Sequence, residues 1–101
     1  MEFGLIMFTK HALKRCQQRS IPQDLCDLVI SYGEYRYDKH GARIWFLTKR
    51  TLNKLDQALG SDVKKKIEKK KNLFVVESLD NNSVITVGYS YRASKFIGRA
   101  H

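Results

Sequence analysis

Residues 25–38 read LCDLVISYGEYRYD, and the spacing of the apolar residues changes within this stretch. Before Gly33, apolar side chains recur at the i, i+3, i+4 and i+7 positions that share one face of an α-helix. They are Leu25, Leu28, Val29 and Tyr32. After Gly33, a residue type common at helix ends, side chains alternate with the two-residue period of a β-strand, with Tyr35 and Tyr37 on one face. The sequence therefore predicts a helix that passes directly into a sheet.

A further helix is predicted on the N-terminal side of this stretch. Thr9 is a suitable cap for a helix from Lys10 to about Arg19, because its hydroxyl can accept from a free main-chain N–H of the first turn. Pro22 suits the first turn of the helix that follows, with Ser20 as its expected cap. The chain is thus expected to open with a pair of helices.

Two hairpins separated by helices complete the expected order of elements. Residues 39–41 and 80–82 are predicted turns, since Gly, Asn and Asp tolerate the left-handed backbone of tight hairpins. Thr51 is the expected cap of a third helix that Gly60 ends. The remaining elements are strands at about 35–38 and 42–49, helices at 52–59 and 61–71, and strands at 73–79 and 83–91.

This order predicts a single α+β domain over residues 1–101. The N-terminal helix pair is expected to pack on a four-stranded antiparallel sheet, with a lysine-rich helical segment inserted between the two hairpins. The segment holds the run from Lys64 to Lys71, whose first role is that of a solvated face.

The composition favours a folded protein with an anionic partner. Of the 101 residues, 43% are hydrophobic, which is enough to fill a core and too many for a disordered tail. Lys and Arg number 19 against 10 acidic residues, so the formal net charge is +9. Such a charge attracts phosphates and releases counterions when they bind. It favours nucleic acid, with RNA first, over an anionic membrane surface or an acidic protein.

Cysteine usage and apolar stretches indicate a cytoplasmic protein. Cys16 and Cys26 have no Cys or His partner at zinc spacing and form no disulfide framework, so free thiols in a reducing compartment are expected. Residues 1–8 lack the basic start and the cleavage site of a signal peptide, and no stretch is long enough to cross a bilayer. The acidic residues are scattered, so neither a metal nor a cofactor is predicted.

Three cationic groups form a row on the first predicted helix. The i, i+4, i+8 spacing of His11, Arg15 and Arg19 places them along one ridge, which we call the cationic ridge. Arg15 and Arg19 border the apolar side of the helix, where an unpaired charge is costly. Each therefore needs a carboxylate, main-chain carbonyls or a bound phosphate. Glu77 and Asp27 are the carboxylates expected in a structural ion pair.

The segment HALKRCQQRSIP, from His11 to Pro22, resembles the opening of a bacterial toxin-like family that is still described as a domain of unknown function. Its members share a His-x3-Arg-x3-Arg-x-Ile-Pro pattern and a last hairpin like the one at 75–87. The family is similar to the barnase, EndoU, colicin and RelE group of small metal-independent ribonucleases. The resemblance implies a helix pair packed on an antiparallel sheet. It also implies four site residues: His11, Arg15, Arg19 and Thr86.

These residue types suit cleavage of RNA without a metal. The reaction needs a base for the 2′-hydroxyl proton, an acid for the leaving 5′-oxygen and cations for the charged phosphorane. An imidazole such as that of His11 is the natural acid or base, and the two arginines are expected to hold phosphate oxygens. Thr86 is expected to donate to a phosphate oxygen, and His40 is a more remote second acid. Further RNA contacts are predicted at Arg43, Lys64, Lys65, Ser90, Tyr91 and Arg92.

The leading hypothesis is therefore a metal-independent endoribonuclease of a toxin–antitoxin or related toxin system, with an acidic antitoxin or immunity protein as partner. A non-catalytic RNA- or DNA-binding module is the alternative, because aromatic and cationic residues alternate over residues 35–37 and 89–92. A basic adaptor that docks an acidic protein explains the same charge. The three hypotheses predict, in turn, cleavage in EDTA, salt-sensitive binding without cleavage, and a complex that survives nuclease treatment.

Overall fold

Helices and strands come in pairs along the chain. The computed structural model describes residues 6–70 and 72–89. Its elements are α1 (Lys10–Gln18), α2 (Gln23–Tyr32), β1 (Glu34–Tyr37), β2 (Ala42–Phe46), α3 (Lys49–Leu59), α4 (Ser61–Glu68), β3 (Leu73–Ser78) and β4 (Val84–Tyr89). The predicted α+β architecture is confirmed, with two helices between the hairpins.

The strands form one antiparallel sheet in the order β1-β2-β3-β4. Each hairpin pairs two consecutive strands, and β2 pairs with β3 in the middle, where Trp45 lies opposite Val75. Both turns contain a left-handed residue, Gly41 at φ 77° and Asn82 at φ 56°, as their residue types predict. The two hairpins therefore join into a single sheet through their inner strands.

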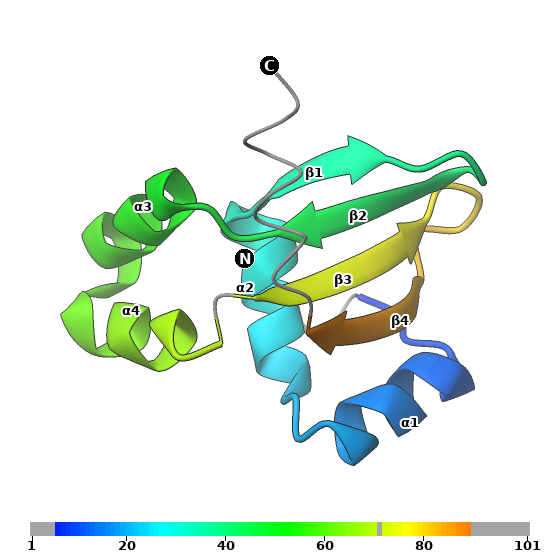
Figure 1. The fold of residues 1–101 in the computed structure, drawn as a ribbon, viewed down its shortest axis with the longest axis horizontal. Helices are drawn as coiled ribbons and strands as arrows, with labels where there is room; N and C mark the ends of the chain where they lie inside the picture. Colours follow the sequence, from blue (N-terminus) through cyan, green and yellow to red (C-terminus); the bar gives the residue numbers. More distant parts are fainter. Residues whose placement is uncertain (1–5, 71, 90–101) are drawn as a thin grey trace.

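α2 covers the centre of one sheet face. It packs against β2 and β3, and Figure 1 shows it crossing behind these strands. Its inward side chains join those of the sheet in one core cluster, which includes Leu25, Cys26, Val29, Leu73, Val75, Val84 and Val87. Burial of this apolar surface is the main favourable contribution to folding.

α1 lies along the edge strand of the sheet. Most of its contacts with other elements are with β4, and in Figure 1 it runs beside that strand. Ala12 and Cys16 are buried in the core, while Lys10 and Lys14 are exposed. The two N-terminal helices therefore cover different parts of the sheet, and only α2 spans its centre.

α3 and α4 pack against each other at the end of the sheet away from the two hairpin turns (Figure 1). Leu52, Leu55 and Ile67 are buried, whereas Leu59, the last residue of α3, is 41% exposed. None of the helices within the described ranges is long and apolar enough to cross a membrane.

The predicted starts of two helices are wrong. Thr48 is the N-cap of α3: its hydroxyl accepts from the N–H of Thr51, and the Thr51 hydroxyl accepts from the N–H of Thr48. β2 ends at Phe46, before the expected residue 49. Ser20 does not cap α2, because it has a left-handed φ of 53° in the link, and Pro22 is the N-cap. In a capping box made of two threonines, the sequence does not show which one is the N-cap. Thr48 also fits the alternation of the preceding strand, so Thr51 was the expected cap.

Gly33 ends α2 as predicted, but without a left-handed backbone, since its φ is −76°. A Cβ at this position would lie 2.6 Å from the Phe46 carbonyl oxygen and would clash with that of Val29. Glycine is therefore needed here because the end of α2 approaches β2 closely.

Candidate functional site

The segment before α1 is tied to the first residues of β4. The N–H of Thr9 donates to the Val84 carbonyl at 2.9 Å, and the N–H of Val84 donates to the Met7 carbonyl at 2.7 Å. The Thr9 hydroxyl accepts from the N–H of Ala12 at 3.1 Å and donates to the Ile85 carbonyl at 3.4 Å. The predicted cap is confirmed, and it also fixes the N-terminal end of α1 on β4.

Arg19 ties the other end of α1 to the same strand. Its Nη1 donates to the Val87 carbonyl at 2.8 Å. Gly88 leaves room for the guanidinium, because a Cβ there would lie 2.7 Å from Nη1. α1 and β4 therefore run side by side in the same direction, and a main-chain carbonyl meets part of the hydrogen-bonding need predicted for Arg19.

Arg15 and His11 contact each other on α1, one turn apart. The Nε–H of Arg15 donates to Nε2 of His11 at 3.4 Å, and Nη1 of Arg15 donates to Oε1 of Gln18 at 3.3 Å. His11 is exposed and Arg15 half-buried. Both hydrogen bonds are at the long end of the normal range, so an incoming anion can replace them at small cost.

Glu77, one carboxylate expected to pair with the cationic ridge, does not reach it. Glu77 is buried and forms an ion pair with Arg43, with 3.2 Å between Oε1 and Nη2. The same Oε1 accepts from Nε1 of Trp45 at 2.9 Å. The carboxylate therefore belongs to the centre of the sheet.

Asp27, the other expected partner, also stays apart from the ridge. It is buried on α2, and its Oδ1 has no hydrogen-bond partner within the described residues. Burial, and after it the charge of Asp24, raises the pKa of this carboxyl group. Arg15 and Arg19 thus form no ion pair within residues 6–70 and 72–89. Their charges stay available to an anion.

Thr86 lies between the two points at which α1 is tied to β4. It pairs with Val76 and is half-buried. Strand alternation places its side chain on the same face as position 88, about 7 Å along the strand. The guanidinium of Arg19 lies over that face at Gly88. The structure therefore brings Thr86 and Arg19 to one face of β4, although no hydrogen bond joins Thr86 to the ridge in the described part of the chain.

Lys70 adds positive charge at the end of β4, and the sequence reasoning missed it. Its Nζ donates to the Ser20 carbonyl at 3.2 Å and to the Tyr89 hydroxyl at 3.0 Å, and it lies 5.6 Å from the centroid of the Tyr89 ring. The signal was the pairing of strand ends: Leu73 lies opposite Tyr89, so the residues just before β3 reach the end of β4.

Other residues predicted to contact RNA lie away from the ridge. The strand register places Arg43 on the opposite sheet face from Thr86. Lys64 and Lys65 are on α4, and His40 is exposed in the turn between β1 and β2. Three more fall outside the described residues: Ser90, Tyr91 and Arg92.

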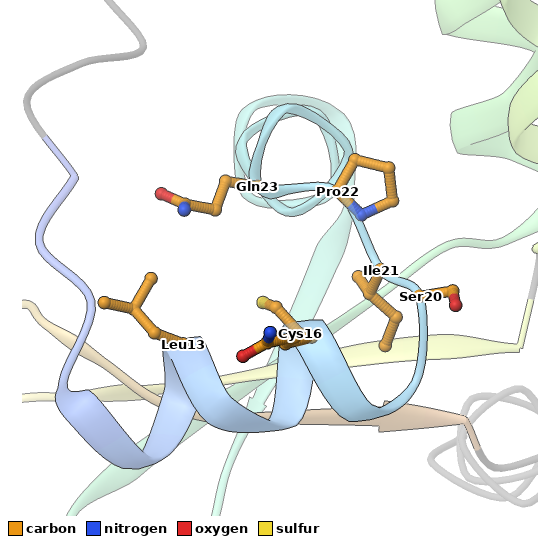
Figure 2. A pocket seen from close by; sticks show the side chains of 7 residues that line it. Leu13, Cys16, Ser20, Ile21, Pro22 and Gln23 are labelled. Carbon is orange, nitrogen blue, oxygen red and sulfur yellow. The ribbon is translucent and has the colours of Figure 1, made fainter.

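An open groove of about 570 Å³ separates α1 from α2. Figure 2 shows Leu13 and Cys16 of α1 facing Gln23 at the start of α2. The groove is lined by uncharged residues only: Leu13, Cys16, Gln17, Ser20, Ile21, Pro22 and Gln23. The groove is therefore separate from the cationic ridge.

The two cysteines are buried free thiols, as expected. Burial raises the pKa of both the Cys16 and the Cys26 thiol. Because the thiolate is the reactive form, neither is poised as a nucleophile. Within the described ranges, no group of three or more His, Cys, Asp or Glu side chains is placed to hold a metal ion.

Comparison with known proteins leaves the site to be judged on its geometry. No family model, curated protein or solved structure matches the chain. The resemblance to the toxin-like family stays a prediction that rests on the motif between His11 and Pro22.

Proposed function

We propose that this chain is a metal-independent endoribonuclease of a toxin system, and that its site is the cationic ridge with the adjoining face of β4. One observation carries the proposal: α1 is tied to β4 at both ends, so the ridge follows the strand as a fixed row. Within the described residues, no carboxylate neutralises Arg15 or Arg19. Guanidinium groups on a fixed helix, without internal counter-ions, suit a phosphodiester backbone.

The proposed reaction is attack of a 2′-hydroxyl on the adjacent phosphate. His11 takes the proton of the 2′-hydroxyl as the new P–O bond forms. Arg15, Arg19 and the hydroxyl of Thr86 stabilise the charge that develops on the phosphorane oxygens. The imidazolium then returns its proton to the leaving 5′-oxygen as the second P–O bond breaks. The products are a 2′,3′-cyclic phosphate and a 5′-hydroxyl end.

The test is cleavage of a defined single-stranded RNA by the purified chain in EDTA. We expect cyclic-phosphate ends, and no cleavage of the same sequence with 2′-O-methyl groups, because that substrate lacks the nucleophile. His11→Ala should abolish cleavage. The control Lys14→Ala removes an exposed neighbour of His11 on α1 and should retain it. Full activity of His11→Ala, or intact RNA after incubation with the unmodified chain, contradicts the proposal.

A non-catalytic nucleic-acid-binding module is the second candidate. The observation that favours it is the contact between Arg15 Nε and His11 Nε2 on an exposed helix surface, where a histidine can act as one more hydrogen-bonding group. This function predicts binding that weakens steeply with salt and leaves the RNA intact.

The proposal also includes an acidic antitoxin or immunity protein and a cytoplasmic site of action. A carboxylate-rich surface that covers the ridge would compete with RNA for Arg15 and Arg19. The buried thiols Cys16 and Cys26 suit a reducing compartment.

A further inference from the structure

Three aromatic side chains form a cluster on β1 and β2. The ring centroids of the cross-strand partners Tyr35 and Trp45 are 4.8 Å apart. Those of Tyr35 and Tyr37 are 5.4 Å apart, with the ring planes at 82°. The strand register places all three on the sheet face opposite Thr86. We call Tyr35, Tyr37 and Trp45 the aromatic platform, which reaches β1, an outer strand of the sheet in the described residues.

Polar contacts beside the aromatic platform hold two of its rings, Tyr35 and Trp45, in place. The guanidinium carbon of Arg43 lies 5.4 Å from the centroid of the Tyr35 ring and 5.8 Å from that of the Trp45 ring. Glu77, which is 7% exposed, binds Arg43 at 3.2 Å and Nε1 of Trp45 at 2.9 Å. Because one buried carboxylate fixes both groups, the platform is pre-organised, which lowers the entropy cost of binding a ligand.

The outer rings of the platform are open to solvent. Tyr35 is 41% and Tyr37 64% exposed. Their hydroxyl oxygens lie 3.5 Å apart, so the polar ends of the rings meet and leave ring surface for contact. A contiguous exposed aromatic surface of this kind is typical of a binding site.

The charge beside the platform favours a ligand with phosphates. Lys39, two residues after Tyr37, is exposed, and the guanidinium of Arg43 lies on the platform face. The carboxylate of Asp38 is turned into the hairpin, where Oδ1 accepts from two main-chain N–H groups at 2.7 and 3.1 Å. Stacking rings beside cations are the combination found in sites for single-stranded nucleic acid.

We propose that the aromatic platform binds unpaired bases of single-stranded RNA by stacking. This inference rests on the proposed function, because it names how the same substrate class is held at a second place. The platform lies on the sheet face opposite Thr86 and the Arg19 guanidinium, so it holds a neighbouring part of the RNA rather than the reacting phosphate. Bases in a duplex are already stacked, and duplex RNA is therefore a poor ligand for it.

The fluorescence of Trp45 supplies a local test, because it is the one tryptophan of the chain. The probe is a single-stranded 2′-O-methyl RNA of about 12 nucleotides, a length within the range of such sites. It cannot be cut through a 2′-hydroxyl. Inorganic polyphosphate and a duplex of the same sequence are the ligand controls. We expect the single strand to quench Trp45 emission and polyphosphate to bind without quenching.

Three variants separate stacking from hydrogen bonding by the Tyr37 hydroxyl and from general loss of apolar surface. Tyr37→Ala should weaken the affinity for the single strand about tenfold and reduce the quenching, whereas Tyr37→Phe should stay within about twofold of the unmodified chain. Leu59→Ala is the control, since it removes another exposed apolar side chain, 41% exposed, on α3. It should leave the affinity unchanged. Thermal unfolding checks that each variant is folded.

The outcomes distinguish this inference from the proposed function. Unchanged affinity in Tyr37→Ala, or equal quenching of Trp45 by polyphosphate, overturns the stacking inference but not the proposed ribonuclease function. RNA that quenches Trp45 but is never cut in its unmethylated form overturns the ribonuclease and supports the platform. If the unmodified chain binds no single strand, both are overturned. Self-association of the chain that Tyr37→Ala abolishes, without RNA binding, assigns the platform to a protein contact and overturns the proposal.

Discussion

The guanidinium of Arg19 occupies the space that a side chain at position 88 would need. A Cβ on Gly88 would lie 2.7 Å from Nη1 of Arg19 and 2.9 Å from Cζ of Phe74. The same Nη1 donates to the Val87 carbonyl at 2.8 Å. The absence of a side chain at position 88 therefore allows the end of α1 to be tied to β4.

Gly88→Ala is expected to loosen this attachment. The added methyl group should lower the free energy of unfolding by about 1–3 kcal/mol, as overpacking in an ordered region does. It should also weaken binding of 2′-O-methyl RNA, but by less than Arg19→Ala does, because Gly88→Ala displaces the guanidinium that Arg19→Ala removes. Urea unfolding and a binding titration measure the two effects.

A double-mutant cycle isolates the contact between positions 19 and 88. In an Arg19→Ala background one of the clashing groups is gone, so Gly88→Ala should cost less stability than it does alone. If Gly88→Ala lowers the free energy of unfolding equally with Arg19 and with Ala at position 19, the added methyl group clashes with Phe74 alone.

The salt dependence of RNA binding should report on Arg15. A residue that contacts one phosphate of a single strand contributes about 0.7 to the slope of log affinity against log salt concentration. Arg15→Gln should therefore flatten that slope by about this amount. The control Lys14→Gln makes the same charge change at an exposed neighbour on α1 and should flatten it less. Equal slopes for the two variants would show that only net charge matters.

Most of the fold could be predicted because the spacing of its apolar side chains distinguishes helices from strands. The helical spacing from Leu25 to Tyr32 and the alternation after Gly33 locate α2 and β1, and the turn residues locate both hairpins. The position of α1 could not be predicted, because it depends on hydrogen bonds from Thr9 and Arg19 to main-chain groups of a strand far along the chain. Hydrogen bonds to main-chain groups cannot be inferred from the pattern of side-chain types, because every residue carries the same main-chain carbonyl.

The residue types of the candidate site could be predicted from the sequence, but the groups that surround them could not. The spacing of the cationic ridge follows from helix geometry alone, so His11 and Arg15 lie together as expected. The partners of the arginines do not follow from it. The sequence offers Glu77 and Asp27 as carboxylates, but it does not show that Glu77 is bound to Arg43 or that Oδ1 of Asp27 has no hydrogen-bond partner among the described residues. These facts depend on strand register and on which helix face is buried.

The start of α3 provides a test of the reassigned cap. Thr48→Ala removes the hydroxyl that accepts from the N–H of Thr51 at 3.1 Å and donates to Glu34 at 2.8 Å. We expect the free energy of unfolding to fall by about 1 kcal/mol, the usual cost of a lost N-cap. Thr48→Ser keeps the hydroxyl and should change stability by a few tenths of that amount. If the two variants lose the same stability in urea unfolding, the cap is not at Thr48.

Asp27 is expected to make stability depend on pH in the direction opposite to most acidic residues. Burial raises its pKa in the folded chain, so the native state keeps this proton to a higher pH than the unfolded state, whose aspartates titrate near about 4. The contribution of this carboxyl to stability is therefore full below that unfolded value and is lost as the pH rises through the folded pKa. Asp27→Asn removes the titration, so its free energy of unfolding should gain on that of the unmodified chain as the pH rises above about 4. Urea unfolding at several pH values measures the gain, with Asp80→Asn, a change at an exposed turn residue, as control. A difference between Asp27→Asn and the unmodified chain that stays constant over this range would mean that the buried carboxyl does not hold its proton.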